Sequence, residues 1–509
     1  MPRKNLKKPY FLIAIFLVAS PAIIFGFSTL YFYSQLQLYI SFNDNLNYNN
    51  YIGEFKEPDY AFLELRAAQM EERIQKYHTP NGSVLSVKFT DKELTEVKYY
   101  GGKGDSTIWT GCYIAGEAFR WAVADRTNSL EDRTKSEIAI MRALNHFEDC
   151  LQVTGIRGAL ARYACPWSEE NAELNLCGYD DSEVEGGEYD GWTYHTYVSR
   201  DQLNGLSFGY GLIYDLVKNS TIKEKIAKHV EWIVDYFERN RWQSIMEDGT
   251  QSFRLAPMEP MLYRTPSGSN HLLAWLNLAR RINYDKYNPI YQRWAIDKNL
   301  AFMTDEPVDY NVLFAYYTIN VITLAMYGLI NLEPNLELKE MYTDSYIRSI
   351  YDVVRYHRNA FQNFIYMNVT GMNRFDIEAN MILKDSLDAL QRFAETKYPN
   401  RNNGVYNTWW DDFEDIVDPI SITVNKRMSR PIMMMNPLSA HTEFKIHSKY
   451  ALPINRRGSG SFIWQDSPFE LNYDGDKESK YCFPGNDYTL VYWMGRYYYY
   501  IPDGEGNYT

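Results

Sequence analysis

The chain has 509 residues and a formal net charge of −13, so it is long enough to bury a large core in one large domain or in two or three smaller ones. Its acidity argues against a nucleic-acid partner, because no Lys/Arg-rich run occurs after the first eight residues. The aromatic content of 16% fits both aromatic packing between helices and aromatic faces that stack on sugar rings.

The N-terminus combines a basic tail with a long uncharged run. Residues 1–9 carry Arg3, Lys4, Lys7 and Lys8, and residues 10–40 carry no charge. Such a run is long enough to cross a bilayer of about 30 Å, and a basic flank is typical of the cytoplasmic side. We therefore predict a cytoplasmic tail at 1–9, a transmembrane signal-anchor at 10–40 and an extracytoplasmic main domain. A cleaved signal peptide is the alternative, although no small-residue cleavage site follows a short apolar core.

The Asn- and Tyr-rich residues 41–56 are predicted to form a stalk, and 57–509 the main domain. Five cysteines fit a location outside the cell. Cys165 with Cys177, or Cys112 with Cys150, are candidate disulfide pairs, but the spacing does not fix the pairing.

Apolar residues recur at three- and four-residue steps through most of the main domain, which predicts helices. The first is expected at 58–77, before a β-hairpin at about 84–97. Further helices are expected at 107–124, 130–153, 201–217, 221–238, 267–282, 289–302, 309–330, 336–357, 359–367, 381–398 and 487–497. A long irregular stretch separates the second and third of these, at 156–198.

The helix at 201–217 is the one around which we organise the prediction. Ser199 is placed to cap it, and Asp201 puts an acid in its first turn. Gly205, Gly209 and Gly211 each cost about 1 kcal/mol in a helix interior. We therefore expect a neighbouring helix or a ligand to come very close to them.

The helices alternate between short and longer connections, as helical hairpins arranged around an axis do. The first helix of each pair is the more apolar, so it should be the inner one. Five hairpins, plus a last helix partnered by the helix at 58–77, predict a mainly α fold, an (α/α)6 toroid. A superhelical repeat array is the alternative, but no motif recurs at a fixed period. Residues 402–481 are expected to be a β-containing insertion, with short strands at 420–424, 443–446 and 461–464.

In such a ring, the N-termini of the inner helices open on one end. The residues found there are acids, amides, a histidine and aromatics, which a carbohydrate site uses for proton transfer, hydrogen bonding and stacking. Asp, Asn and Ser also gather at helix starts because they cap helices, so capping is the competing explanation. The candidate substrate-binding residues at these starts are Trp109, Arg200, Gln202, Asn270, His271 and Asn311, and Asp201 is a candidate catalytic carboxylate.

The loop 180–197 combines acids, glycines, aromatics and one histidine just before the organising helix. A loop this long is usually functional or disordered. Asp190 is the second candidate carboxylate, His195 and Tyr194 are candidates for proton transfer, and Trp192 is a stacking face. Arg162 or Arg200 would neutralise a substrate carboxylate. A solvated acidic surface and a structural histidine are the alternatives.

No cofactor is expected, although the acids at 180–190 leave a structural calcium open. Trp409, Trp410, Asp411 and Asp412, and the stretch 439–443, are secondary site candidates. The sequence lacks a phosphate-binding glycine loop and the zinc-peptidase and serine-hydrolase motifs.

Several stretches resemble the six-hairpin glycosidase-like superfamily, from about residue 100 to the end. They are 108–111 with 118–121, 199–202 with 208–211, and 487–488 with 492–497. The resemblance implies the toroid, and a range of activities that includes glycoside hydrolases, uronyl hydrolases, epimerases and polysaccharide lyases. It supplies no catalytic pair, so the site residues rest on the local patterns above.

The sequence thus predicts a membrane-anchored, extracytoplasmic toroid that cleaves a polysaccharide or glycan by hydrolysis or β-elimination. The alternative is a surface toroid that binds glycan or protein without catalysis. A multi-pass membrane protein is disfavoured, because the apolar stretch 312–330 contains Asn320. The oligomeric state is not predicted.

Overall fold

The fold is taken from a computed structural model of the chain. It describes residues 26, 47–48, 51, 55–178, 181–246, 248–256, 266–304, 316–396, 417–422, 446–448, 451–457, 460–469 and 480–503. Within these residues, none of the helices combines the length and apolarity needed to span a bilayer. The predicted anchor at 10–40 lies outside the described residues except for residue 26, and it stays a prediction.

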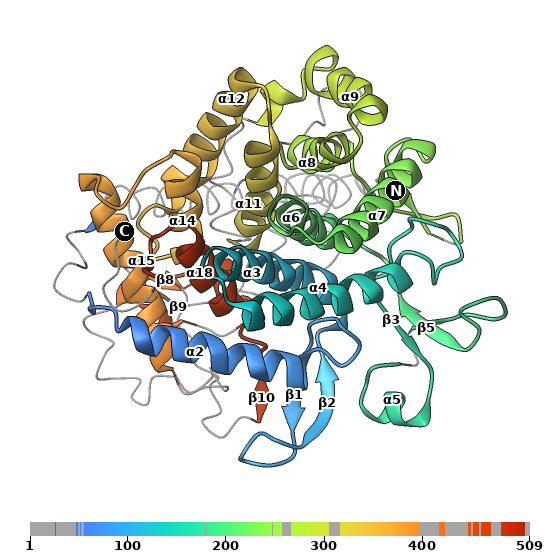
Figure 1. The fold of residues 1–509 in the computed structure, drawn as a ribbon, viewed down its shortest axis with the longest axis horizontal. Helices are drawn as coiled ribbons and strands as arrows, with labels where there is room; N and C mark the ends of the chain where they lie inside the picture. Colours follow the sequence, from blue (N-terminus) through green and yellow to red (C-terminus); the bar gives the residue numbers. More distant parts are fainter. Residues whose placement is uncertain are drawn as a thin grey trace, which may run out of the picture.

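The fold is mainly helical, with paired helices in two concentric layers (Figure 1). Each inner helix contacts its outer partner, and the inner helices contact one another in a closed series in which α18 meets α3. The inner helices are α3 (Ser106–Arg126), α6 (Arg200–Leu216), α8 (Pro266–Ile282), α11 (Tyr316–Leu332), α14 (Ala360–Val369) and α18 (Asn486–Tyr497). Their outer partners are α4 (Leu130–Cys150), α7 (Ser220–Arg239), α9 (Tyr284–Gln292), α12 (Leu336–Tyr346), α15 (Ile377–Glu395) and α2 (Tyr60–Arg73). This arrangement is consistent with the predicted (α/α)6 toroid.

Burial separates the two layers as the apolar pattern predicts. Almost every residue of α3 is buried, whereas α7 buries one stripe and leaves its charged face in solvent. The stripe consists of Ile222, Ile226, Val230, Ile233 and Phe237 with their neighbours on the same face.

Short antiparallel sheets and helical turns lie between the helices of the ring. The sheets follow the orders β10-β1-β2, β3-β5-β4, β6-β7 and β8-β9. Their strands are β1 (Ser86–Phe89), β2 (Val97–Gly101), β3 (Tyr163–Pro166), β4 (Ser182–Glu183), β5 (Trp192–His195), β6 (Gln243–Ile245), β7 (Gln251–Arg254), β8 (Val417–Ile422), β9 (Ile446–Ser448) and β10 (Tyr481–Cys482). The turns and short helices are η3 (Ile74–His78), η4 (Lys103–Asp105), α5 (Glu169–Glu173), η6 (Arg293–Asp297), η7 (Ala301–Thr304), η8 (Ile347–Tyr351), α13 (Asp352–Val354), η11 (Ile454–Arg456) and η12 (Ile463–Gln465).

The structure corrects three local predictions. The helix expected from Pro289 begins at Tyr284, because Asn283 caps it by accepting from the Lys286 N–H at 3.2 Å, and Pro289 lies inside it. The strand expected at 461–464 overlaps η12, a 3-10 turn. The stretch expected to be irregular at 156–198 contains the sheet β3-β5-β4.

The glycines of α6 lie where two inner helices touch. A Cβ on Gly205 would stand 2.5 Å from the Ile108 Cα of α3, and a Cβ on Gly209 would stand 2.5 Å from Gly111 O. On α3, a Cβ at Gly111 would stand 2.1 Å from Gly205 O. These positions accept no side chain, so the close approach predicted from the sequence is confirmed for Gly205 and Gly209. A Cβ on Gly211 would meet only the Leu332 Cδ1, at 3.4 Å, so the approach predicted for this third glycine is not found.

Candidate active site

The first turn of α6 is fixed by a capping box. The Ser199 Oγ accepts from the Asp201 N–H at 3.3 Å, and the Gln202 Oε1 accepts from the Ser199 N–H at 2.8 Å. The Gln202 Oε1 is therefore part of the helix cap and is not free to bind a substrate. The Asp201 carboxyl makes no hydrogen bond or ion pair with any other residue that the structure describes.

The surroundings of Asp201 favour its protonated form. Burial raises the pKa of the half-buried Asp201 carboxyl, and the nearby Asp105 carboxylate raises it further. Arg162 and Arg200 oppose the shift without cancelling it. Asp201 is thus a carboxylic acid that holds its proton to a higher pH than an exposed aspartate does.

Arg162, the residue before β3, brings Asp105 to the start of α6. Its Nε donates to Tyr197 O at 2.8 Å, its Nη1 donates to Gly104 O, and Nη1 lies 3.6 Å from the Asp105 Oδ1. The Gln202 Nε2 donates to the same Asp105 oxygen at 3.3 Å. The Asp105 side chain is 61% exposed, so it is an accessible carboxylate held from two sides.

Arg200 and Tyr317 complete the group. The Arg200 Nε donates to Arg254 O at 3.0 Å, which fixes one edge of its guanidinium. Tyr317, in the first turn of α11, is 50% exposed, and its pKa is raised by burial and by the charge of Asp201. Asp105, Arg162, Arg200, Asp201 and Tyr317 are called the Asp201 cluster below.

Three other predicted binding residues are buried in the inner helices. The Asn204 Nδ2 donates to the His271 Nδ1 at 2.5 Å, and burial lowers the pKa of His271 well below its ordinary value, with Arg200 adding to the shift. Trp109 stacks on Phe462 with ring centroids 5.0 Å apart. The Asn270 Oδ1 and the Trp109 Nε1 are buried without a hydrogen-bond partner among the described residues.

His195 belongs to a charged chain near the cluster. Its Nδ1 lies 3.0 Å from the Asp181 Oδ1, and the Lys103 Nζ donates to the other oxygen of Asp181 at 2.9 Å. Burial alone would raise the pKa of Asp181. Hydrogen bonds from His195 and Lys103 outweigh the effect of burial and hold this pKa below its ordinary value. His195 O accepts from the Arg162 N–H at 2.9 Å, so this chain adjoins the Asp201 cluster through the backbone.

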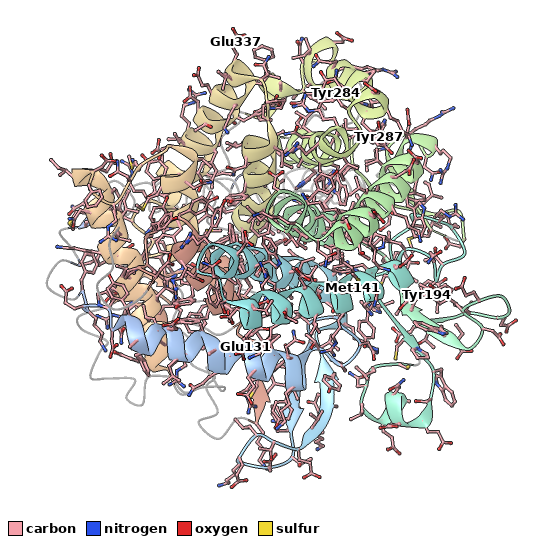
Figure 2. The ribbon with its side chains drawn as sticks, viewed as in Figure 1. Glu131, Met141, Tyr194, Tyr284, Tyr287 and Glu337 are labelled. Atoms are coloured by element: carbon pink, nitrogen blue, oxygen red, sulfur yellow. The ribbon has the colours of Figure 1, made fainter. Side chains whose placement is uncertain are left out.

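The loop before α6 places its other candidates elsewhere. Tyr194 neighbours His195 on β5, so the two side chains point to opposite faces of the sheet, and Tyr194 is buried on the side of the molecule that carries β5 (Figure 2). It lines a separate pocket of about 500 Å³, with Gln152, Arg157, Glu183, Glu188 and Tyr189. Asp190 is exposed and accepts from the Gly186 N–H at 2.6 Å, while Trp192 packs edge-on against Tyr189 at 5.1 Å. No contact in the described part of the chain joins these residues to Asp201.

Several candidates lie outside the described residues, namely Asn311, Asp180, residues 409–412 and residues 439–443. Among the described residues, no group of three His, Cys, Asp or Glu is placed to hold a metal ion, and all five cysteines are free thiols. The structural calcium that the sequence left open at 180–190 remains untested.

Sequence reasoning did not select Asp105 as a site residue, and it missed Tyr317 altogether. Asp105 immediately precedes the inner helix α3, as Ser199 precedes α6, so its position in the repeat was an available signal. Tyr317 had no local signal, because its closeness to Asp201 depends on how α6 and α11 pack.

Neither a family model nor a curated protein matches the chain. The solved structures that resemble it include endoglucanase CelQ from Clostridium thermocellum, complexed with cellotriose in one structure and with cellotetraose in another. Each is 13% identical to this chain. The first match covers 89% of this chain and 73% of the other with a TM-score of 0.42, and the second covers 88% and 72% with a TM-score of 0.41. Scores this low at this identity carry no argument about fold or function.

Proposed function

We propose that the chain is a glycoside hydrolase whose active site is the Asp201 cluster. The observation that carries the proposal is the Asp201 carboxyl, which is half-buried, unpartnered among the described residues and raised in pKa. A general acid for glycosidic cleavage needs these properties, since it must keep a proton near neutral pH and deliver it to the leaving oxygen.

The roles of the two carboxyl groups follow from their surroundings. The Asp201 carboxyl donates its proton to the glycosidic oxygen as the bond to the anomeric carbon breaks. We assign the second role to Asp105, because it is exposed, lies 3.6 Å from the Arg162 Nη1 and accepts from the Gln202 Nε2. It acts either as the base for an attacking water or as the nucleophile, depending on the separation of the two carboxyl groups around the bound sugar.

The contacts of the other candidates support hydrolysis over β-elimination. Elimination requires a free base close to a cation that neutralises the substrate. Asp181 holds the His195 ring through Nδ1, and no hydrogen bond or ion pair among the described residues joins that ring to the side chain of Arg162 or Arg200. Tyr194 lines a different pocket, so neither candidate base is grouped with the arginines. A carboxylic acid beside an accessible carboxylate is the arrangement that hydrolysis uses.

The test is activity on a panel of polysaccharides, following new reducing ends together with ultraviolet absorbance from unsaturated products. We expect reducing ends without absorbance. Asp201→Asn should lower kcat/KM by about 10²–10⁴-fold, the usual contribution of a general acid. Asp285→Asn, in the exposed first turn of the outer helix α9, is the matched control and should leave kcat/KM unchanged. Glycan binding with no product, unaffected by Asp201→Asn, would instead support a non-catalytic binding protein.

The pH profile separates the two carboxyl groups. Because the Asp105 charge raises the pKa of Asp201, Asp105→Asn should lower that pKa. The residual activity of Asp105→Asn should then fall at a lower pH on the alkaline side than wild-type activity does. An unchanged alkaline limb would contradict the coupling of the two groups.

We also propose that residues 10–40 anchor the enzyme with its main domain outside the cytoplasm. The support is the uncharged run and its basic flank. Membrane fractions washed with alkaline carbonate should retain the full chain, and a protease added outside intact cells should digest the main domain. Release by the wash or full protection from the protease would contradict the anchor.

A further inference from the structure

The two arginines of the Asp201 cluster carry N–H groups that have no bonded acceptor among the described residues. Backbone carbonyls occupy the Nε and Nη1 of Arg162 and the Nε of Arg200. In the described part of the chain, no acceptor is bonded to the Arg162 Nη2 or to the Nη1 and Nη2 of Arg200. Arg200 is therefore fixed through its Nε, and its Nη1 and Nη2 form an open edge that can bind an oxygen anion through two hydrogen bonds, while Arg162 has its Nη2 open.

The charge balance around them is also incomplete. Elsewhere in the fold, two buried arginines meet a carboxylate at short range, Arg280 with Glu333 at 2.6 Å and Arg358 with Asp388 at 2.6 Å, whereas the buried Arg457 donates to backbone carbonyls. Arg162 has only Asp105, at 3.6 Å, and Arg200 has no ion pair among the described residues. Burial lowers the pKa of both guanidiniums, which is the sign of cations that have lost water without gaining an equivalent anion.

The other charges near the cluster do not supply that anion. Asp105 lies 3.6 Å from the Arg162 Nη1, and the Asp201 carboxyl makes no ion pair with either arginine in the described part of the chain. Lys103 is already matched by Asp181 at 2.9 Å. Neither carboxyl group of the cluster forms an ion pair with Arg200 among the described residues, and the formal net charge of the chain is −13, so the arginines are not part of a generally basic surface.

We infer that the Asp201 cluster binds an anionic sugar, with the open edge of Arg200 and the Arg162 Nη2 holding the carboxylate of a hexuronate ring. The planar carboxylate accepts paired hydrogen bonds from a guanidinium edge, and its charge supplies the missing partner. Tyr317, half exposed beside Asp201, offers an aromatic face for the same ring. The inference rests on the proposed glycan-cleaving function and narrows its substrate to uronate-containing polysaccharides.

The test compares matched ligands that differ only in charge. Oligomers of galacturonate, mannuronate and glucuronate are offered beside their carboxyl-reduced, neutral counterparts, with sulfated oligosaccharides as a third arm. Binding is measured by calorimetry on the full chain in detergent, using Asp201→Asn to prevent turnover. We expect at least one uronate oligomer to bind at least tenfold more tightly than its reduced counterpart, and its affinity to fall as salt rises.

Variants locate the effect. Arg200→Gln and Arg162→Gln should each weaken uronate binding at least tenfold and leave the reduced oligomer unaffected. Arg200→Lys keeps the charge but loses the fork, so it should recover only part of the affinity. Arg239→Gln, on the exposed face of the outer helix α7, is the matched control and should bind as the parent does. Thermal melts separate lost contacts from lost folding.

The outcomes distinguish the inference from the proposed function. Equal affinity for charged and reduced oligomers, tighter binding of sulfated than of carboxylated oligomers, or no uronate binding at millimolar concentration would overturn the inference. Cleavage of neutral glycans with unchanged KM in both glutamine variants would support the proposed hydrolase activity and contradict uronate binding. Uronate binding that needs both arginines, without release of reducing ends, would support the inferred uronate site and contradict the proposed hydrolase activity.

Discussion

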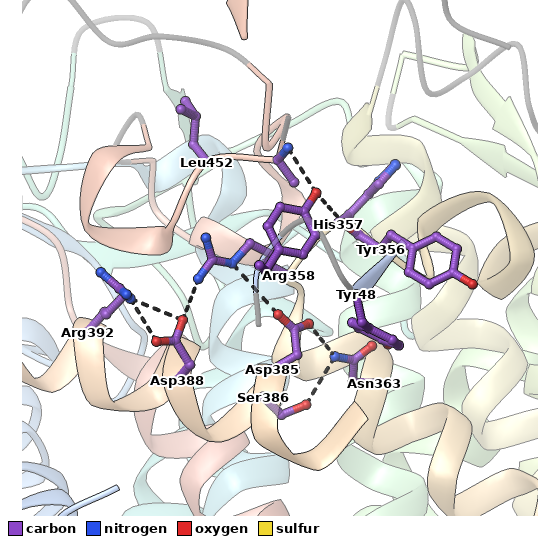
Figure 3. A network of polar contacts seen from close by, with 12 residues as sticks. Tyr48, Tyr356, His357, Arg358, Asn363, Asp385, Ser386, Asp388, Arg392 and Leu452 are labelled. Atoms are coloured by element: carbon purple, nitrogen blue, oxygen red, sulfur yellow. Dashed lines mark hydrogen bonds and ion pairs between the residues drawn. The ribbon is translucent and has the colours of Figure 1, made fainter. Parts of the chain in front are cut away.

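Two aspartates one helical turn apart on α15 show how strongly surroundings control a single carboxyl group (Figure 3). Asp388 meets the Arg358 Nη2 at 2.6 Å and the Arg392 Nε at 2.8 Å. Asp385 is fully buried, and its nearest cation is the Arg358 Nε at 3.7 Å. Burial raises the pKa of Asp385 to about 6, with the Asp388 charge adding to the shift, although Arg358 and a hydrogen bond from Asn363 oppose it.

Asp385 should therefore make stability depend on pH. Its folded pKa exceeds its ordinary value of 3.8, so its contribution is fully present below about pH 4 and is lost as the pH rises through about 6. A change of one in pKa corresponds to about 1.4 kcal/mol, so the loss is roughly 3 kcal/mol. In Asp385→Asn, this component should disappear.

Denaturant unfolding of both proteins at pH 4, 5, 6 and 7 measures the effect. The stability of the wild type relative to Asp385→Asn should fall as the pH rises, with most of the change between pH 4 and 6. A relative stability that rises over this range would show that Asp385 is ionised in the fold and stabilised by Arg358.

At the same scale, sequence reasoning reached Asp201 and Arg200 because a helix start is a local signal. It could not rank the residues of the loop before α6. The side chains of Tyr194 and His195 alternate across β5, and only the pairing with β3 decides which of them lies near the cluster. Tyr317 lies more than a hundred residues from Asp201 in the chain, so no local pattern could have placed it there.

At the scale of elements, the contact between α3 and α6 is the one most sensitive to added volume. Gly205 and Gly111 leave no room for a methyl group, because backbone atoms of the facing helix occupy the space. Gly328 in α11 differs, since a Cβ there would meet nothing within 4 Å. Two helical glycines thus have opposite expected responses to the same change.

Gly205→Ala should destabilise the fold by at least the roughly 1–3 kcal/mol typical of overpacking, because backbone must move to admit the methyl group. Gly328→Ala should be neutral or stabilise by up to about 1 kcal/mol, because alanine is the better helix former. Thermal and denaturant unfolding of both variants checks the pair. Equal effects would mean that α3 and α6 do not touch as described.

Helices were the most predictable elements, because apolar periodicity and capping are encoded within one or two turns. Ser199, whose side chain caps α6, is an example. The start of α9 was misplaced because Pro289 suits a first turn, yet the Asn283 cap begins the helix earlier. The turn at η12 was mistaken for a strand because its short apolar run fits both structures.

At the scale of the whole molecule, the ring is tied by contacts between distant parts of the chain. The segment predicted to be a stalk contacts the helical ring where it is described. The Tyr48 hydroxyl donates to Arg355 O at 3.1 Å, and the Lys56 N–H donates to the Asp388 Oδ1 at 2.8 Å. Asp59 continues the contact, its N–H donating to the Gln391 Oε1 at 2.9 Å. These bonds lead the chain along α15 and into α2, which pairs with α18 and closes the ring (Figure 1).

Tyr51 joins three segments at one hydroxyl group. Its O–H donates to Tyr356 O at 3.3 Å and accepts from the Ala451 N–H at 3.3 Å, and its ring lies under the Arg358 guanidinium at 5.0 Å. Because the tyrosine is 2% exposed, water does not replace these bonds if the hydroxyl is removed. Tyr51→Phe leaves a buried N–H and a buried C=O unpaired, which should cost about 1–3 kcal/mol.

The same substitution tests whether this hydroxyl couples the three segments. Hydrogen exchange in Tyr51→Phe should increase at Ala451 and in the segment 355–358 as well as around residue 51, because each loses part of a shared contact. Tyr99→Phe, on the exposed strand β2, is the matched control and should change neither stability nor exchange at those positions. If exchange rises only around residue 51, the N-terminal segment rests on the ring without stabilising it, and closure depends on α2 and α18 alone.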